Sequence, residues 1–508
     1  MRTRLIASLT ASAAILSITC AAQATIIRVP DDHATIQLGV WNATPGDTVL
    51  VECGTYNETL IFFQIDDVTL LSETGEPTCV TIDGGGQDHV FVVFGATGVV
   101  IDGFTVTGGV ADFGGGARID SSDVLIRDCV FRGNAATIEG GGIWWRKGTP
   151  DIRDCDFEDN DAANSGGGLC LNSTDGDVDG CYFYQNEARW GGGMAVYHTS
   201  TTTINGCTFT ENGAVGGDAY GGGLYTWNGT DVTIVTCGFY RNTSEYCGGG
   251  ACSDTDCEDS YFMNTFDTNA ASFGGGFYAW GNDGGSIDAC SFYDNTAAFS
   301  GGGALFEEVT GATLMGSLFE GNSAGTAGGG IAFEDCSWGP STCVFVSNQA
   351  SYGGAVAVEE SDGGQTVFGC TMVLNGLSGG RTSGTGIAVG DNAGALVTQT
   401  IIAFSESGEA VAVVPGSAVT LTTCDLYANP GGNWVGVIAD QLPLRHNMES
   451  DPNFCGLHAD WYDLCADSPC LPGNNGAGLR VGAYGHGCDA CGSPVEARTW
   501  GAIKALYH

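Results

Sequence analysis

The residues best able to do chemistry in this chain include a small group of cations. Only 16 of the 508 residues are Lys or Arg, against 59 Asp and Glu, which gives a formal net charge of −43. Six of the cations nevertheless lie close together in the sequence: Arg118, Arg127, Arg132, Arg146, Lys147 and Arg153. This group could form one basic patch that holds an anionic ligand. A solvated face whose cations pair locally with acids is the alternative interpretation.

A second group that could bind a ligand is aromatic. Trp or Tyr recurs at the second and fourth positions after runs of glycine. If the first residue after each run faces inward in a strand, the second and fourth face outward. The pattern then predicts two exposed columns, with Trp144, Tyr225 and Tyr278 in one and Tyr197, Trp227 and Trp280 in the other. Such rings could stack on sugars or bury in a protein partner, and a ladder that only stabilises the sheet is the alternative.

No residues are predicted to be catalytic or to bind a metal. Glycoside hydrolysis needs carboxylates that converge on one bond, and no acidic group stands out from the many in this chain, including the close set Asp154, Asp156, Asp159 and Asp161. Calcium is a candidate cofactor for so acidic a protein, although the short nine-residue calcium-binding repeat is absent.

Two groups of cysteines stand out among the 22. In the first, a cysteine stands two residues before an aromatic residue, as in Cys155 and Phe157. Stacked strands lie about 4.8 Å apart, farther than the roughly 3.8 Å between the Cβ atoms of a disulfide, so these should be buried thiols, with cross-coil bridges as the alternative. The second group lacks the paired spacing of a zinc site, and disulfides are expected within it. Its members are Cys455, Cys465, Cys470, Cys488 and Cys491.

One repeat must position all of these residues. An aromatic slot, usually Phe, returns at steps of 26 to 30 residues, and an asparagine follows three residues later. A glycine run separates successive copies, and each copy holds two segments with the alternation of strands. A fixed period of this length indicates one unit stacked on itself. The ladder asparagines, which we expect to hydrogen-bond from turn to turn, are Asn134, Asn160, Asn186, Asn212, Asn242, Asn269, Asn295, Asn322, Asn348 and Asn375.

The predicted fold class is all-β, a right-handed parallel β-helix of roughly fourteen coils, near 65 Å long at about 4.8 Å per coil. A leucine-rich repeat has a similar period, but scarce leucine and dense glycine disfavour it. Residues 1–24 have the pattern of a secretory signal peptide. We expect an N-terminal helical cap at 25–47, the β-helix at 48–430, a cysteine-rich closing coil at 431–492 and a tail at 493–508.

Two motifs carry a resemblance to known families. The segments Asp47–Glu58, Val80–Gly86 and Val100–Gly108 resemble the opening coils of secreted bacterial right-handed β-helix proteins of the pectin-lyase-like superfamily. The repeated Gly-Gly-(Ala/Ile/Leu) and Phe-x-x-Asn pair resembles the polymorphic outer-membrane protein repeat of chlamydial autotransporter adhesins. The resemblance covers about residues 25 to 430.

The resemblance implies a secreted or cell-surface bacterial protein. We expect a non-catalytic, adhesin-like or structural role in which an exposed sheet face binds a glycan or a surface protein. The alternative is a polysaccharide lyase or glycoside hydrolase that acts on acidic polysaccharide. The acidic surface argues against nucleic acid as a partner. After the signal segment, no stretch approaches the roughly 20 apolar residues of a membrane helix.

Overall fold

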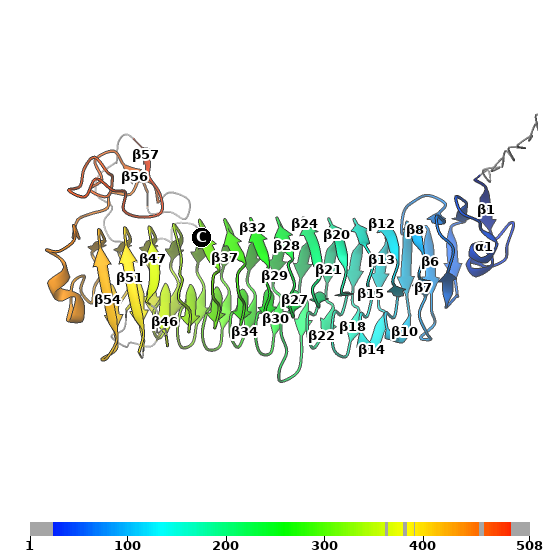
Figure 1. The fold of residues 1–508 in the computed structure, drawn as a ribbon, viewed down its shortest axis with the longest axis horizontal. Coiled ribbons are helices and arrows are strands. Elements are labelled where there is room, and N and C mark those ends of the chain that lie inside the picture. Colours follow the sequence, from blue (N-terminus) through cyan, green and yellow to red (C-terminus); the bar gives the residue numbers. More distant parts are fainter. Residues whose placement is uncertain (1–23, 361–363, 379–383, 391, 457–461, 489–508) are drawn as a thin grey trace, which may run out of the picture.

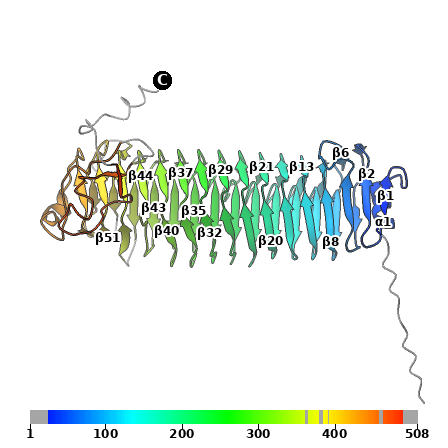
Figure 2. The ribbon, with the colours of Figure 1, turned by 90° about the horizontal axis from the view of Figure 1, so that it is seen from above.

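The structure, a computed structural model, describes residues 24–360, 364–378, 384–390, 392–456 and 462–488. These residues form a long rod of stacked turns (Figures 1 and 2), with the N-terminal end in blue and the last turns in orange. Helical structure within them is limited to α1 (Ile36–Asn42) and a 3-10 helix, η1 (Gly436–Gln441). The predicted all-β class is confirmed. Nearly all of the expected signal peptide, and the whole of the expected tail, lie outside the described residues.

Each turn of the rod carries up to four short strands rather than the two expected. In one turn these are β15 (Ile143–Arg146), β16 (Pro150–Arg153), β17 (Asp156–Glu158) and β18 (Asp161–Ala162), and β19 (Leu169–Asn172) begins the next turn. Each strand pairs in parallel with its counterpart in the neighbouring turn. Most of the rod therefore has four parallel sheets, which we number I to IV in chain order. A small fifth parallel sheet near the C-terminal end consists of β47 (Gln365–Phe368), β51 (Gly394–Thr398) and β54 (Ala418–Thr422).

The four sheets run along most of the rod. Sheet II has 12 strands, from β1 (Ile26–Val29) to β40 (Thr313–Met315), and sheet III has 15, from β3 (Gly54–Tyr56) to β55 (Asp425–Tyr427). Sheet IV has 11, from β10 (Val110–Phe113) to β49 (Gly376–Leu377). Sheet III contributes one strand per turn, so the fourteen coils predicted are too few.

Sheet I has 14 strands and positions the residues discussed below. Its strands are β4 (Ile61–Phe63), β7 (Phe91–Phe94), β11 (Ala117–Asp120), β15, β19, β23 (Met194–Tyr197), β27 (Leu224–Trp227), β31 (Ala251–Asp254), β35 (Phe277–Trp280), β39 (Ala304–Glu307), β43 (Ile331–Glu334), β46 (Val356–Glu359), β50 (Ile387–Val389) and β53 (Val411–Val413).

The Phe-x-x-Asn pairs form two internal ladders. From Phe131 to Phe345, rings in successive turns stack with centroids 4.5 to 5.4 Å apart. The asparagines are buried, and Asn212 shows the pattern: its Nδ2 donates to Phe183 O at 2.9 Å and to Asn242 Oδ1 at 3.0 Å. Its Oδ1 accepts from both nitrogens of Asn186 at 3.0 Å. The structural interpretation of the asparagine ladder is confirmed.

The glycine runs let the backbones of successive turns lie very close together where the chain enters sheet I. Gly166 has a φ of +62°, a region that L side chains rarely adopt. A Cβ on Gly167 would lie only 2.4 Å from the carbonyl oxygen of Gly192 in the next turn. Larger residues would therefore force successive turns apart at this corner.

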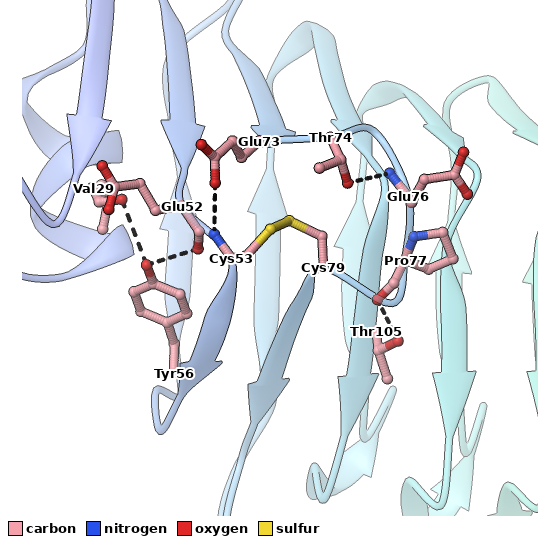
Figure 3. Close-up of a disulfide and its surroundings, with 10 residues drawn as sticks. All are labelled: Val29, Glu52, Cys53, Tyr56, Glu73, Thr74, Glu76, Pro77, Cys79 and Thr105. Atoms are coloured by element: carbon pink, nitrogen blue, oxygen red, sulfur yellow. Dashed lines mark hydrogen bonds between the residues drawn. A yellow bond between two sulfur atoms is a disulfide. The ribbon is translucent and has the colours of Figure 1, made fainter.

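The cysteines that precede the aromatic slot are buried free thiols, as predicted, and Cys155 Sγ lies 3.6 Å from Ile126 O in the preceding turn. A disulfide that the sequence analysis missed joins Cys53 to Cys79, directly before β3 and β6 (Val80–Asp83), with Cα atoms 4.6 Å apart (Figure 3). The pair occupies equivalent positions in neighbouring turns, which is the cross-coil geometry judged less favourable above. It lies outside the thiol ladder, where Glu73 accepts a hydrogen bond from the Cys53 N–H.

Short segments flank the rod at its ends. Helix α1 packs against β1, β2 (Thr48–Val51) and β4, with Ile36 and Val40 buried. At the other end, η1 contacts β53 and β54 (Ala418–Thr422) and buries Ile438.

The cysteine-rich segment does not form a closing coil. It lies beside the rod, with β56 (Leu464–Cys465) and β57 (His486–Cys488) at the left of Figure 1. Its apolar residues pack on the outer face of sheet III, where Val481 joins a cluster with Val344 and Val373. This face is unusually apolar, so covering it removes hydrocarbon surface from water. Ala483 N–H also donates to Thr371 Oγ1 at 2.9 Å, and so ties the segment to an earlier turn.

Replacing one ladder asparagine should weaken the rod. Asn212→Ala would remove the partner of the buried Asn186 N–H and of the Phe183 carbonyl in the preceding turn, at a cost of about 1–3 kcal/mol for each that stays unsatisfied. Asn186 Nδ2 and Asn242 Oδ1 each keep one other hydrogen bond, to Phe157 O and from the Asn212 N–H. We expect a clear fall in the melting temperature measured by circular dichroism. Asn205→Ala, at an exposed position of the same turn, is the control. An equal, small effect of both variants would contradict the ladder's role.

Candidate functional site

Sheet I presents its second and fourth residues outward, as the sequence predicted. In β27, for example, Leu224 and Thr226 point to the interior, where both are fully buried, while Tyr225 and Trp227 lie on the outer face. Register is kept from strand to strand, so equivalent residues form columns along the rod. The two columns nevertheless differ strongly in their exposure.

The second-position column is covered, and the exposure predicted for it is wrong. Trp144, Tyr225 and Tyr278 are each only 5 or 6% exposed. The linker from sheet IV folds over them in each turn, and rings such as Phe113, 5.0 Å from Trp144, and Tyr220, 5.8 Å from Tyr225, form an outer apolar layer. These three side chains stabilise the layer and cannot stack on a ligand from solvent without its rearrangement.

The fourth-position column leaves two of its three predicted aromatic residues accessible. Trp227 is 37% and Trp280 is 40% exposed, but Tyr197 is buried against Tyr225 and Trp227. The His198 ring lies 5.2 Å from the Trp227 ring on the solvent side of the turn. The exposed tryptophans therefore stand at equivalent positions of β27 and β35, with β31 between them.

Asp254, which the sequence analysis did not single out, occupies the same column between the tryptophans. Its Oδ2 accepts from the Tyr225 hydroxyl at 2.7 Å and its Oδ1 accepts from Thr255 Oγ1 at 2.8 Å. Burial raises the pKa of this carboxyl. Trp227, Asp254 and Trp280 together are called the tryptophan site below. The signal for Asp254 was its fourth position after a glycine run, which it shares with both tryptophans.

A buried carboxylate lies inside the rod next to the tryptophan site. Asp259 follows β31 and is buried, and it accepts hydrogen bonds from Thr226 Oγ1, Ser253 Oγ (2.8 Å), Thr230 Oγ1 (2.9 Å) and the Val232 N–H (2.9 Å). Burial raises its pKa, and the donors act in the opposite direction. Thr226 and Ser253 immediately precede Trp227 and Asp254 in sequence, so this network fixes the two strands that carry them. Nothing in the repeat pattern identified it.

Beyond Trp280 the fourth-position column becomes acidic. Glu307, Glu334 and Glu359 follow in consecutive strands. Burial, together with the charges of the two flanking glutamates, raises the pKa of Glu334 to about 7. The outer face of sheet I thus carries a row of three acidic side chains on one side of the tryptophan site, of which Glu334 is only partly ionised near pH 7.

The six cations do not form the single basic patch that was one of the two interpretations. Arg127 and Arg153 lie on sheet II, Arg132 lies on sheet III, and the other three lie on sheet I or the turn after it. Four of them pair with acids, in Arg127–Asp102, Arg132–Glu158, Arg146–Asp120 and Arg153–Asp151. The interpretation as a solvated, locally paired face describes these four. Lys147 is exposed in the turn after β15.

Arg118 differs from the other arginines. Its guanidinium lies 5.5 Å from the centre of the Trp144 ring, and no ion pair links it to the part of the chain that the structure describes. It borders a groove of about 360 Å³ on the outer face of sheet I, near the N-terminal end. The lining residues are Leu60, Phe62, Asp88, His89, Val92, Val93, Phe94, Arg118 and Asp120. We call this the Arg118 groove.

The C-terminal cysteines do not all form disulfides. Cys455 and Cys488 are bonded, as expected, and Cys465 Sγ lies 3.6 Å from Cys488 Sγ. Cys470 is instead a buried free thiol whose sulfur lies 3.2 Å from Asp425 Oδ2, and the prediction for it is wrong. Cys491 lies outside the described residues.

Two groups of potential metal ligands occur within the described ranges, and both include disulfide sulfurs. They are Cys455, Cys465 and Cys488, and Cys53, Glu73 and Cys79. Bonded sulfur is not a thiolate, the form of cysteine that binds metals. In the same ranges, no helix is long and apolar enough to cross a membrane.

Asp259→Asn should destabilise the turns that carry the tryptophan site. The amide NH2 would face donors that now point at a carboxylate, leaving at least one buried hydroxyl or N–H unsatisfied at about 1–3 kcal/mol. We expect a lower melting temperature by circular dichroism. Asp256→Asn, at an exposed position of the same turn, is the matched control. If the two variants melt alike, the buried network does not support these strands.

Glu334→Gln should remove one source of pH-dependent stability. The folded-state pKa, about 7, lies above the ordinary value of 4.5, so folding favours the protonated form. The stability that Glu334 contributes is therefore complete below about pH 4.5 and is lost as the pH rises through about 7. Between about pH 6 and pH 8 the melting temperature of the wild-type protein should fall more than that of the variant. Glu187→Gln, exposed on β22 (Glu187–Ala188), should keep the wild-type slope. Identical slopes for all three proteins would contradict the expectation.

Comparisons with known proteins agree with the fold. The family described as "Right handed beta helix region" matches residues 78–237 and 222–383. No curated protein matches the chain. One similar solved structure is a mannuronic-acid-specific family 6 polysaccharide lyase from human gut microbiota, which is 11% identical, with 84% of this chain and 91% of that chain covered and a TM-score of 0.37. Another is tailspike protein 3 of bacteriophage CBA120, which is 10% identical, with 80% of this chain and 60% of that chain covered and a TM-score of 0.36. Neither likeness is close enough to carry an argument about activity. The family model spans more than half of the sequence, and the chain belongs to the right-handed β-helix family.

Proposed function

We propose that this protein is a non-catalytic, extracellular β-helix rod that binds a glycan through the outer face of sheet I. The observation that carries the proposal is the tryptophan site, where two half-exposed indoles flank a carboxylate in one register column. Indole faces supply apolar area for the C–H face of a sugar, and a carboxylate accepts hydrogen bonds from its hydroxyls.

The charge distribution and the bonding of the acids support this function. A formal net charge of −43 repels nucleic acid. At the tryptophan site Asp254 is already held by Tyr225 and Thr255, and in the Arg118 groove Asp120 pairs with Arg146. Neither site offers two unengaged carboxylates at the spacing that glycoside hydrolysis needs.

A lyase that acts on acidic polysaccharide is the second candidate. The observation that favours it is Arg118, whose guanidinium faces a groove and has no carboxylate partner among the described residues. Such a cation could neutralise a uronate carboxylate.

The proposal of a non-catalytic rod has further parts. It includes secretion, attachment at a bacterial surface, adhesin-like contact with a surface protein, calcium binding and capping of the rod end by α1.

A polysaccharide panel would test the proposal. The chain from Thr25 onward would be incubated with neutral and uronate-containing polysaccharides, with calcium or with a chelator, and retention and chain cleavage would be followed in the same samples. We expect retention without cleavage. Cleavage that Arg118→Ala abolishes would overturn the non-catalytic function in favour of the lyase. Absence of retention and of cleavage throughout would reject both. Loss of retention in chelator alone would identify calcium as a cofactor.

A further inference from the structure

We propose that the tryptophan site binds a neutral, β-1,4-linked glycan whose chain lies along the rod axis. Trp227 and Trp280 would stack on two sugars that are separated by a third. This inference rests on the proposed glycan-binding function and specifies its ligand.

The spacing of the two indoles favours this chain. They are two strands apart in a parallel sheet, which places them about 10 Å apart along the axis. One sugar of an extended β-1,4-linked chain advances by about one strand spacing, and in its twofold form every second sugar presents the same face. The face that stacks on Trp227 would therefore be presented again at Trp280. A peptide ligand bound as an extended strand would fit less well. Its side chains point the same way every two residues, about 6.6 Å apart, which does not match the spacing of the two indoles.

The residue between the indoles suits the sugar in the middle. Asp254 lies midway in the column, and each of its oxygens already accepts one hydroxyl. Asp254 is 7% exposed, so only the small part of its carboxylate that reaches solvent between the indoles can use a further lone pair to accept from a sugar hydroxyl. The middle sugar of a twofold chain is turned over relative to its neighbours and needs polar contacts at this point rather than a third ring.

The surrounding charge excludes an acidic chain. A glycan that continues past Trp280 along the column meets Glu307, then Glu334 and Glu359. In the twofold form, every second uronate would place its carboxylate on the same side of the chain near this row of glutamates, and like charges at that separation repel. A neutral chain meets the same glutamates as hydrogen-bond acceptors. The tryptophan site thus favours a neutral glycan, whereas the Arg118 groove would favour an anionic one.

Binding is stronger when an indole already holds its bound position in the free protein, and Trp227 does so. Trp227 is fixed by edge contacts with the buried Tyr197 and by the ring of His198, whose Nδ1 lies 2.7 Å from Asn228 Nδ2. Inside the rod, Thr226 of the same strand is bonded to Asp259. An indole held in this way loses little conformational entropy on binding.

Calorimetric titration with oligosaccharides of defined length would test the inference. The probes are β-1,4-linked cello-, manno-, xylo- and chito-oligosaccharides of two to six sugars, with an α-1,4-linked glucan series and oligogalacturonates as comparisons. Affinity for at least one β-1,4-linked series should rise most between two and three sugars, since three are needed to reach both tryptophans. Trp227→Ala and Trp280→Ala should each weaken binding of the longer chains by about tenfold and remove this step.

Matched variants keep the result interpretable. Trp227→Tyr and Trp280→Tyr should retain most of the affinity, and Phe262→Ala, which removes a 47% exposed ring from sheet II, should leave it unchanged. Binding only to oligogalacturonate or to α-linked chains, unaffected by either tryptophan variant, would overturn the inference and leave glycan binding intact. A β-1,4-linked ligand without a step at three sugars would also overturn it. No binding to any probe or polysaccharide would reject the proposed function as well.

Discussion

The structure depends on one constraint, which is that every side chain inside the rod must stack on its counterpart at the spacing of paired strands. The phenylalanine rings meet it as near-parallel stacks, and each asparagine amide meets it by donating both to the asparagine of the next turn and to a backbone carbonyl of the preceding turn. Glycine at the entry to sheet I meets it because a Cβ there would collide with the neighbouring turn. A residue that fits one turn therefore fits all of them, and the repeat follows from this.

The same constraint couples the inside of the rod to its surface. Inner and outer residues alternate along each strand of sheet I, so Thr226 and Ser253, which bind the buried Asp259, fix the strands on which Trp227 and Asp254 face outward. The interior is polar where the outer face carries the tryptophan site. The turns that contain β27 and β31 therefore differ from the rest of the rod in both their interior and their outer face.

What is exposed on the rod is decided by segments that lie outside the stacked strands. Linkers from sheet IV cover the second-position column of sheet I, and the C-terminal segment covers the apolar outer face of sheet III. Both coverings bury hydrocarbon that the strands would otherwise leave in water. The surface left open combines two exposed indoles, the largely buried carboxyl of Asp254 between them and a run of glutamates, which together set the charge and shape of the ligand that we propose.

The sequence by itself determined the fold class, the internal ladders, the inward and outward positions of sheet I and the buried state of the ladder thiols, because each of these repeats with the period of the chain. Only the tertiary structure decided which outward residues reach solvent. Tyr225 and Trp227 obey the same alternation, yet a linker covers only the first. The tertiary structure also separated the clustered arginines onto different sheets, since neighbours in sequence turn corners of the rod. Periodicity reports the direction of a side chain relative to its own strand, whereas exposure depends on irregular segments that obey no period.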